Sequence, residues 1–155
     1  MINLSGSEHF DPERFIKIEN RPLFTKPIGG LWASPIDAPR SWENWCKKEH
    51  FHLDRLEKNF KFRLKPDAKV LYINYAERLD SLPKVKPQMG LEHFDSWDCL
   101  DFEKLAKKYD AVELSLSNET TQSTHPWKGL YHRLYGWDCD SILIMNKDCI
   151  ELEED

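Results

Sequence analysis

Two aspartates one residue apart, Asp138 and Asp140, stand beside a tryptophan at the start of an apolar run. Trp137 precedes the first aspartate, and the run from Ile142 to Met145 follows the second. Four apolar residues bounded by turn-forming residues are typical of a buried strand. Carboxylates at the mouth of such a strand can oppose positive charge on a reacting group. They can equally be solvated turn acids that keep the strand end soluble, and this stretch alone leaves both interpretations open.

A second stretch combines two glycines with a hydroxyl group, in the order Gly29-Gly30-Leu31-Trp32-Ala33-Ser34-Pro35. Glycines let the backbone turn freely or approach a ligand closely, and the proline keeps Ser34 away from helical geometry. The stretch predicts a short strand that can present a hydroxyl and backbone groups to a ligand. The alternative is a tight turn into an ordinary strand.

The composition bounds the class of protein. A chain of 155 residues fits a single domain, residues 1–155, and its 40% hydrophobic and 32% charged content is ordinary for a soluble globular protein. It has no apolar run long enough to cross a membrane, and its first ten residues lack a secretory pattern. We therefore expect a cytoplasmic protein with no membrane partner. The formal net charge of -5 argues against nucleic-acid binding through bulk charge but permits a local patch.

Several site classes lack their sequence patterns. The four cysteines form no C-x-x-C pair, and Cys46, His50 and His52 match no strong zinc spacing, so we expect no metal. Neither the nucleophile pattern G-x-S-x-G nor the phosphate-binding patterns G-x-x-x-x-G-K-[ST] and G-x-G-x-x-G occur. A carboxylate-pair hydrolase is a weaker option, because nothing fixes the distance between Glu113 and the two aspartates.

Apolar periodicity predicts an α+β fold with a mostly antiparallel sheet. Phe60–Leu64 alternates as a strand with one buried face does, and we expect it to pair in antiparallel fashion with Val70–Ile73. Ser41 is a good N-cap for a helix over Trp42–His50, whose Trp42, Trp45 and Cys46 have core spacing. We expect the tail after Ile150 to fray. The other predicted elements are helices over Ala76–Leu82, Phe102–Tyr109 and Pro126–Leu134, and strands over Asp110–Leu116 and Ile142–Met145.

The order of these pieces resembles the ADP-ribosyltransferase fold. Members of that family often carry an early strand reading aromatic-His-Gly-Thr/Ser, and Gly30-Leu31-Trp32-Ala33-Ser34 is similar to it, with Ser34 at the hydroxyl position. Small toxin-like members carry a Tyr-Asp-Gly-Ile/Val strand, which Tyr109-Asp110-Ala111-Val112 resembles. They then have an acid before a final apolar strand and a closing turn, and residues 140–150 resemble that arrangement.

The resemblance implies a sheet split around a cleft and NAD as a substrate. In the family, the Ser/Thr helps to hold the nicotinamide end of NAD, and the acid before the late strand steadies an oxocarbenium-like ribose. Carried over to this chain, Asp140 is the catalytic acid, and Asp138 supports it. A tryptophan ring would stack on a base of NAD. The residues assigned in this way to NAD binding are Ser34, Trp32, Gly30 and Trp137.

The chain departs from the family pattern at several points. Ala33 replaces a glycine, Trp32 stands where histidine is common, and Asp140 replaces a glutamate. The E-x-E pair of the family is present only as Asp138-x-Asp140. Two functions follow: an NAD-using transferase that modifies an unidentified protein, nucleic acid or small molecule, or a non-catalytic interaction protein, such as an inhibitor of a host enzyme. The small size and acidic charge suit a phage-type protein in either case.

Overall fold

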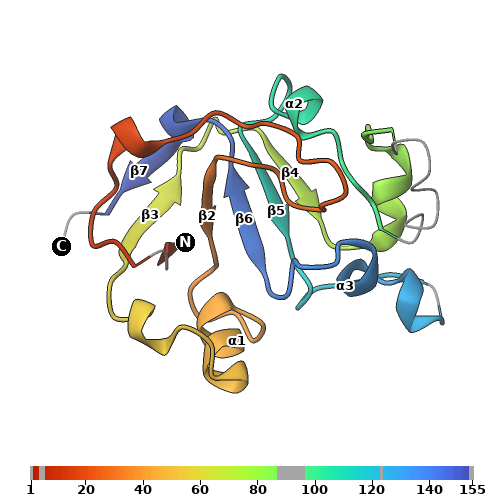
Figure 1. The fold of residues 1–155 in the computed structure, drawn as a ribbon, viewed down its shortest axis with the longest axis horizontal. Helices are drawn as coiled ribbons and strands as arrows, with labels where there is room; N and C mark the ends of the chain where they lie inside the picture. Colours follow the sequence, from red (N-terminus) through yellow and green to blue (C-terminus); the bar gives the residue numbers. More distant parts are fainter. Residues whose placement is uncertain (1, 4–5, 87–96, 123, 154–155) are drawn as a thin grey trace.

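Two β-sheets form the framework of the computed structural model, which describes residues 2–3, 6–86, 97–122 and 124–153 (Figure 1). The four-stranded sheet has the order β2-β6-β5-β4, formed by Leu31–Ala33, Ser141–Ile144, Ala111–Leu114 and Val70–Ile73. The three-stranded sheet has the order β1-β3-β7, formed by Ile2–Asn3, Phe60–Leu64 and Ile150–Leu152. The β4–β5 pair is parallel and the other pairs of described strands are antiparallel, so the chain has an α+β fold with a mixed larger sheet.

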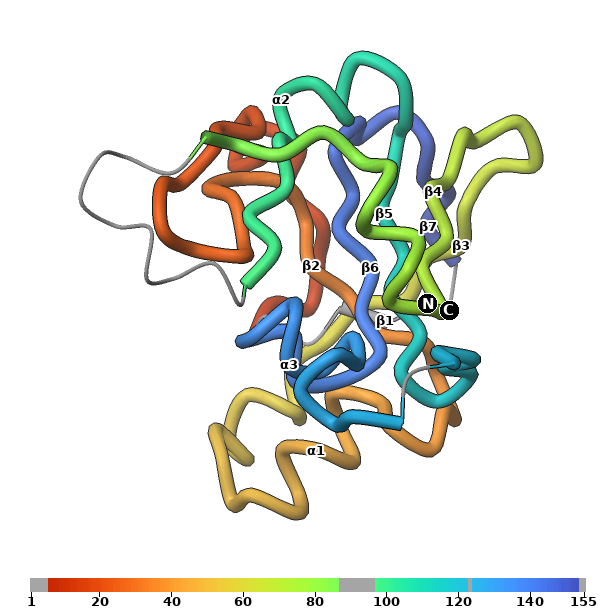
Figure 2. Tube along the Cα trace, turned by 90° about the vertical axis from the view of Figure 1, so that its right-hand side faces the viewer, coloured from red at the N-terminus to blue at the C-terminus, as the bar shows by residue number. Residues whose placement is uncertain are grey.

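The helices are few and short. Figures 1 and 2 place α1 and α3 at one end of the four-stranded sheet and α2 at the opposite end. The α-helices are α1 (Trp42–Glu49), α2 (Phe102–Leu105) and α3 (Leu130–Arg133). The 3₁₀-helices among the described residues are Pro12–Arg14, Leu53–Arg55, Ala76–Ser81, Pro126–Lys128 and Lys147–Cys149. None of the helices in the described part of the chain is long and apolar enough to cross a membrane.

The N-cap predicted for α1 is confirmed, because the Ser41 side chain accepts the N–H of Asn44 at 3.3 Å. The single helix predicted over Pro126–Leu134 is wrong, because the structure has two separate short helices there. Gly129 has an extended conformation between a 3₁₀ turn and α3, and the Glu119 carboxylate accepts the first N–H of α3, from Leu130, at 2.8 Å. This acceptor lies far back in the sequence, so the local apolar pattern does not reveal the break.

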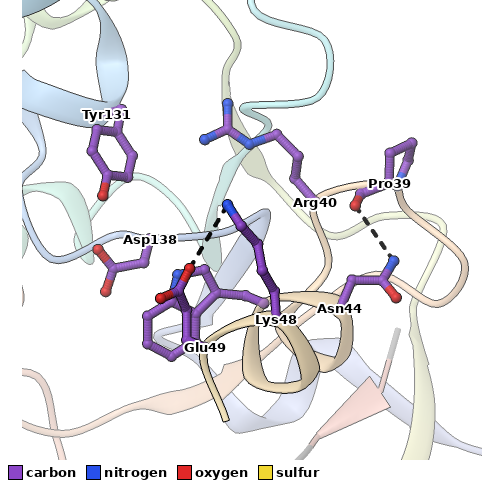
Figure 3. Close-up of a pocket in the computed structure, with 8 residues that line it drawn as sticks. Pro39, Arg40, Asn44, Lys48, Glu49, Tyr131 and Asp138 are labelled. Carbon is purple, nitrogen blue, oxygen red and sulfur yellow. Dashed lines mark hydrogen bonds and ion pairs between the residues drawn. The ribbon is translucent and has the colours of Figure 1, made fainter. Parts of the chain in front are cut away.

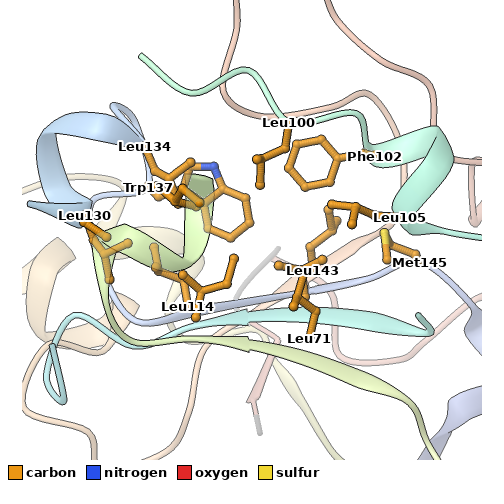
Figure 4. Packing of buried hydrophobic residues seen from close by; sticks show 14 of the residues in the cluster. Leu71, Leu100, Phe102, Leu105, Leu114, Leu130, Leu134, Trp137, Leu143 and Met145 are labelled. Carbon is orange, nitrogen blue, oxygen red and sulfur yellow. The ribbon is translucent and has the colours of Figure 1, made fainter. Parts of the chain in front are cut away.

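Both faces of the four-stranded sheet are covered, which explains why β6 reads as an unbroken apolar run. On one face, Leu114 and Leu143 pack against side chains from α2, α3 and the neighbouring loops (Figure 4). On the other face, Ile142 and Ile144 pack in one cluster with Phe62 of β3. The two sheets therefore share an apolar layer.

The antiparallel pair predicted from β3 and β4 is wrong. β3 pairs with β1 and β7, whereas β4 pairs in parallel with β5. The two strands lie in different sheets because hydrogen bonds at the turn between them lead to different partners. At the end of β3, the N–H of Lys65 donates to the carbonyl of Cys149 at 2.9 Å, next to β7. The N–H of Lys69 instead donates to the Asp110 carboxylate at 2.8 Å, at the start of β5. β7 also contradicts the predicted fraying, because Ile150–Leu152 pairs with β3.

One arginine joins three segments near α3. Arg133 forms ion pairs with Asp98 at 2.6 Å and Asp80 at 2.7 Å, and its guanidinium donates to the carbonyl of Ala76 at 3.0 Å. The hydrogen bond with Asp98 is the main cause that raises the pKa of Arg133 above its ordinary value. The Asp98 side chain is only 9% exposed, so this pair is largely shielded from water.

We predict that Arg133→Gln lowers the free energy of unfolding by about 2–4 kcal/mol, because the nearly buried Asp98 carboxylate loses its charged hydrogen-bond donor and keeps only the longer ion pair with Lys84 at 3.5 Å. Arg63→Gln is the matched control. Arg63 pairs with Glu151 at 2.9 Å on the surface, and such exposed pairs contribute less than about 1 kcal/mol. Urea denaturation of both variants makes the comparison. Equal losses in the two variants would contradict the role given to Arg133.

Candidate functional site

A cavity of about 290 Å³ opens beside β2 and α1, and we call it the β2 cavity. Its wall combines two indole rings, the cationic side chains of Lys26 and Arg55, the imidazole of His52, one carboxylate and small polar side chains. These residues come from four separate segments of the chain. The lining residues that matter for chemistry are Lys26, Trp32, Ser34, Trp42, Arg55 and Asp138.

The two indoles are held by other aromatic rings. Trp32 on β2 meets the buried Trp137 edge to face, with ring centroids 4.7 Å apart. Trp42 in the first turn of α1 stacks on Trp45 at 5.1 Å, and Phe51 packs edge-on against both. The core position predicted for Trp42 and Trp45 is therefore wrong, because both rings are only half-buried and α1 buries Cys46 alone. Fixed, partly open rings are suited to stacking on a flat ligand.

Lys26 is the cation deepest in this wall. Its Nζ lies 5.0 Å from the centre of the Trp32 ring. Burial lowers the pKa of Lys26 below its ordinary 10.5, and the nearby Asp138 and Cys139 oppose that shift only in part. Burial also raises the pKa of the Cys139 thiol to about 11, so this sulfur stays protonated at neutral pH and is a poor nucleophile.

Ser34 lies in the β2 cavity wall, but its hydroxyl is already used within the protein. Its Oγ donates to the carbonyl of Asp140 at 2.8 Å and accepts the N–H of Trp42 at 2.8 Å. These two bonds tie β2 to β6 and to the first turn of α1. The group that the resemblance assigns to NAD therefore has a structural task, and any contact with a ligand adds to it.

The two aspartates have different environments. Asp140 is 2% exposed, and its Oδ1 accepts the N–H groups of Leu116 and Ser117 at 2.6 and 3.0 Å. The interpretation of Asp140 as a solvated turn acid is therefore wrong, because the turn after β5 closes over its carboxylate. Asp138 is partly exposed and lines the β2 cavity, which Asp140 does not. The catalytic role of Asp140 stays a prediction, and Asp138 is the acid that faces the open space.

Gly30 and Trp137 lie outside the β2 cavity. Gly30 has a φ of +72°, and a Cβ there would come within 2.6 Å of the Leu143 side chain and 2.7 Å of the Ile144 carbonyl, so close packing requires the glycine. Trp137 is 1% exposed, and its indole N–H donates to the carbonyl of Thr25 at 3.1 Å. Its ring has no open face, so the predicted stacking on a ligand has no support from its position.

A second cavity, of about 440 Å³, lies on the other side of α1, and we call it the α1 cavity. Figure 3 shows Arg40, Lys48, Tyr131 and Asp138 around it, and Trp45 also lines it. Asp138 borders both cavities. Sequence reasoning singled out Trp32 for ligand binding but not the other cationic and aromatic residues of these walls, because they lie far apart in the sequence and only the fold brings them together.

No protein-family model, curated protein or solved structure matches this chain at a significant level. Within the described ranges, no group of three or more His, Cys, Asp or Glu side chains is placed to hold a metal ion. A function for the chain therefore has to follow from the chemistry of its own cavities.

We predict that Asp140→Ala lowers the free energy of unfolding by about 2–4 kcal/mol, because one buried and one partly buried N–H group lose their charged acceptor. Asp138→Ala, two residues away and partly exposed, should cost less than about 1 kcal/mol. Urea denaturation followed by circular dichroism measures both values. An Asp140→Ala protein as stable as the wild type would refute the structural role of this carboxylate.

Proposed function

We propose that the protein binds NAD in the β2 cavity and transfers ADP-ribose from it to a host macromolecule. The observation that carries the proposal is the grouping of Trp32 and Trp42 with Lys26, Arg55 and Asp138 around one cavity. Aromatic faces and cations are what a dinucleotide requires, for its rings and its phosphates. The resemblance of β2 and β6 to the ADP-ribosyltransferase pattern supports the same substrate.

The roles of the wall residues follow from their charge and shape. Lys26 and Arg55 would contact the diphosphate, because these cations lie in the same wall as the indoles. Trp32 or Trp42 would stack on the nicotinamide or adenine ring. A cavity of about 290 Å³ is small for a whole dinucleotide, so part of a bound NAD molecule would extend out of the β2 cavity.

Asp138 would carry the chemistry of transfer. The bond between nicotinamide and ribose breaks, nicotinamide leaves with the bonding electrons, and positive charge develops on the sugar. A fixed carboxylate opposes that charge and lowers the barrier. An acceptor nucleophile then bonds to the same carbon and releases its proton. Asp140 would act through position, since its backbone and side chain fix the turn on which Asp138 stands.

The alternative is a non-catalytic interaction protein. Exposed aromatic rings around α3 favour it, because Trp127 is 62% exposed and Tyr131 and Tyr135 are also exposed. Aromatic residues of this kind are enriched in protein interfaces. Such a protein would neither bind NAD nor release nicotinamide, so one set of measurements separates the two functions.

We predict that NAD raises the melting temperature of the wild-type protein and that incubation with NAD releases nicotinamide. Asp138→Asn should reduce release about 10²–10³-fold while NAD still raises the melting temperature, because the lost charge acts mainly on the transition state. Asp148→Asn is the control, an exposed acid outside both cavities. Wild-type protein that neither binds NAD nor releases nicotinamide would reject the proposal in favour of the interaction protein.

We also predict that the affinity for NAD falls as the pH rises towards 10.5, the ordinary lysine pKa. Burial lowers the pKa of Lys26, so its positive charge is present at low pH and is lost before that of an exposed lysine. Lys26→Arg keeps its charge throughout this range and should bind NAD with little pH dependence. Titrations from about pH 7 to about pH 10 compare the two proteins. Parallel pH profiles would exclude Lys26 from phosphate binding.

A further inference from the structure

The α1 cavity carries an inference about the acceptor. We propose that it holds one nucleotide of a single-stranded nucleic acid, with the base stacked on an aromatic ring and the backbone beside two cations. The binding itself needs no NAD. The strand's role as the acceptor of ADP-ribose rests on the proposed function, and it would make the nucleic acid the macromolecule that the protein modifies.

The aromatic part of the wall comes from two elements. Trp45 has one face covered by Trp42, at a centroid distance of 5.1 Å, and its indole also lines the cavity. Tyr131 on α3 is 41% exposed and lines the cavity from another side. Every base has a flat face that stacks on such rings, so this part of the wall binds bases of any sequence.

The cations lie beside these rings. Arg40 and Lys48 line the cavity, and the Arg40 guanidinium is 5.9 Å from the centre of the Tyr131 ring (Figure 3). The amine of Lys48 forms an ion pair with Glu49 at 3.7 Å. Both side chains are exposed, so this pair is weak and leaves the amine available to a ligand. Among the described residues, no other lysine or arginine lines this cavity, and the whole chain has a formal net charge of -5. Any contact with a phosphate backbone would therefore come from Arg40 and Lys48.

The acids in the wall decide between ligand classes. Glu49 and Asp138 disfavour a bare phosphate in the cavity, but their oxygens can accept hydrogen bonds from the amino groups of a base. A cationic peptide acceptor is disfavoured in turn, because Arg40 already lies against Tyr131 and would repel an incoming guanidinium. A base inside the α1 cavity would donate hydrogen bonds to these acids, and phosphates outside the cavity would contact the cations.

The position of Asp138 links this site to the transfer chemistry. It borders the α1 cavity and the β2 cavity alike. A base held in the α1 cavity would therefore lie next to the acid that we place opposite the ribose of NAD. Donor and acceptor would approach from the two sides of the stacked pair Trp42 and Trp45, each of which lines one cavity.

The test is binding of a fluorescein-labelled single strand of roughly ten nucleotides, DNA and RNA in turn, measured by anisotropy without NAD. Tyr131→Leu should weaken binding about 5-fold to 150-fold, the effect of losing one stacked base. Lys48→Gln should weaken it and reduce the dependence on salt. In a plot of the logarithm of the binding constant against the logarithm of the salt concentration, each neutralised phosphate contributes a slope of about −0.7. Arg40 and Lys48 together should therefore contribute a slope of about −1.4, and Lys48→Gln should make the total slope less steep by about 0.7.

The controls are matched in residue type. Lys47→Gln removes a neighbouring lysine that pairs with Glu43 at 2.6 Å and does not line the cavity. Trp127→Leu removes an exposed aromatic ring outside it. Both should bind the strand as the wild type does, and melting temperatures of all four variants should show that each is folded.

Three results would overturn the proposal: a wild-type protein that binds no single strand at low salt, controls that weaken binding as much as the cavity variants, or selective binding of an arginine-rich peptide that a single strand does not displace. Strand binding without nicotinamide release would count against the NAD proposal alone. Nicotinamide release without strand binding would count against this one alone.

Discussion

The buried carboxylate of Asp140 is the constraint on which this end of the molecule depends. Its Oδ1 accepts the N–H groups of Leu116 and Ser117, its own N–H donates to the carbonyl of Arg40, and its carbonyl accepts the Ser34 hydroxyl. One residue thus joins the ends of β2, β5 and β6 to the chain that enters α1. Hydrogen bonds to a charged group inside a protein are stronger than those to a neutral one, so the junction is rigid.

This junction separates the groups that hold the structure from those that face a ligand. Asp140 and Ser34 are buried and hydrogen-bonded within the protein, whereas Asp138, from the same turn, lines both cavities. Trp42 is held in a similar way, because its N–H donates to the Ser34 hydroxyl while its ring stacks on Trp45. Rigid backbone with partly open side chains is the arrangement that a preorganised site requires.

The bounds and caps of single elements were predictable from the sequence, whereas the pairing of strands and the burial of the two aspartates were not. The bounds of β4, Val70–Ile73, and the Ser41 cap of α1 follow from periodicity and capping chemistry between near neighbours. The partners of β3 and β4 depend instead on contacts such as that of Lys69 with Asp110, 41 residues apart. The different burial of Asp138 and Asp140 has the same cause, because the turn that covers Asp140 comes from residues 116 and 117.

The placement of Lys26 is the energetic feature that most favours the proposed ligand site in the β2 cavity. Burial lowers the pKa of its amine, which means that the folded protein holds the charged form at a cost in stability. Asp138 and the Trp32 ring offset that cost only in part. An apolar residue would fill the same position without the penalty. A phosphate bound beside the amine would remove the penalty, so the unfavourable placement of Lys26 in the free protein becomes binding energy when an anion enters.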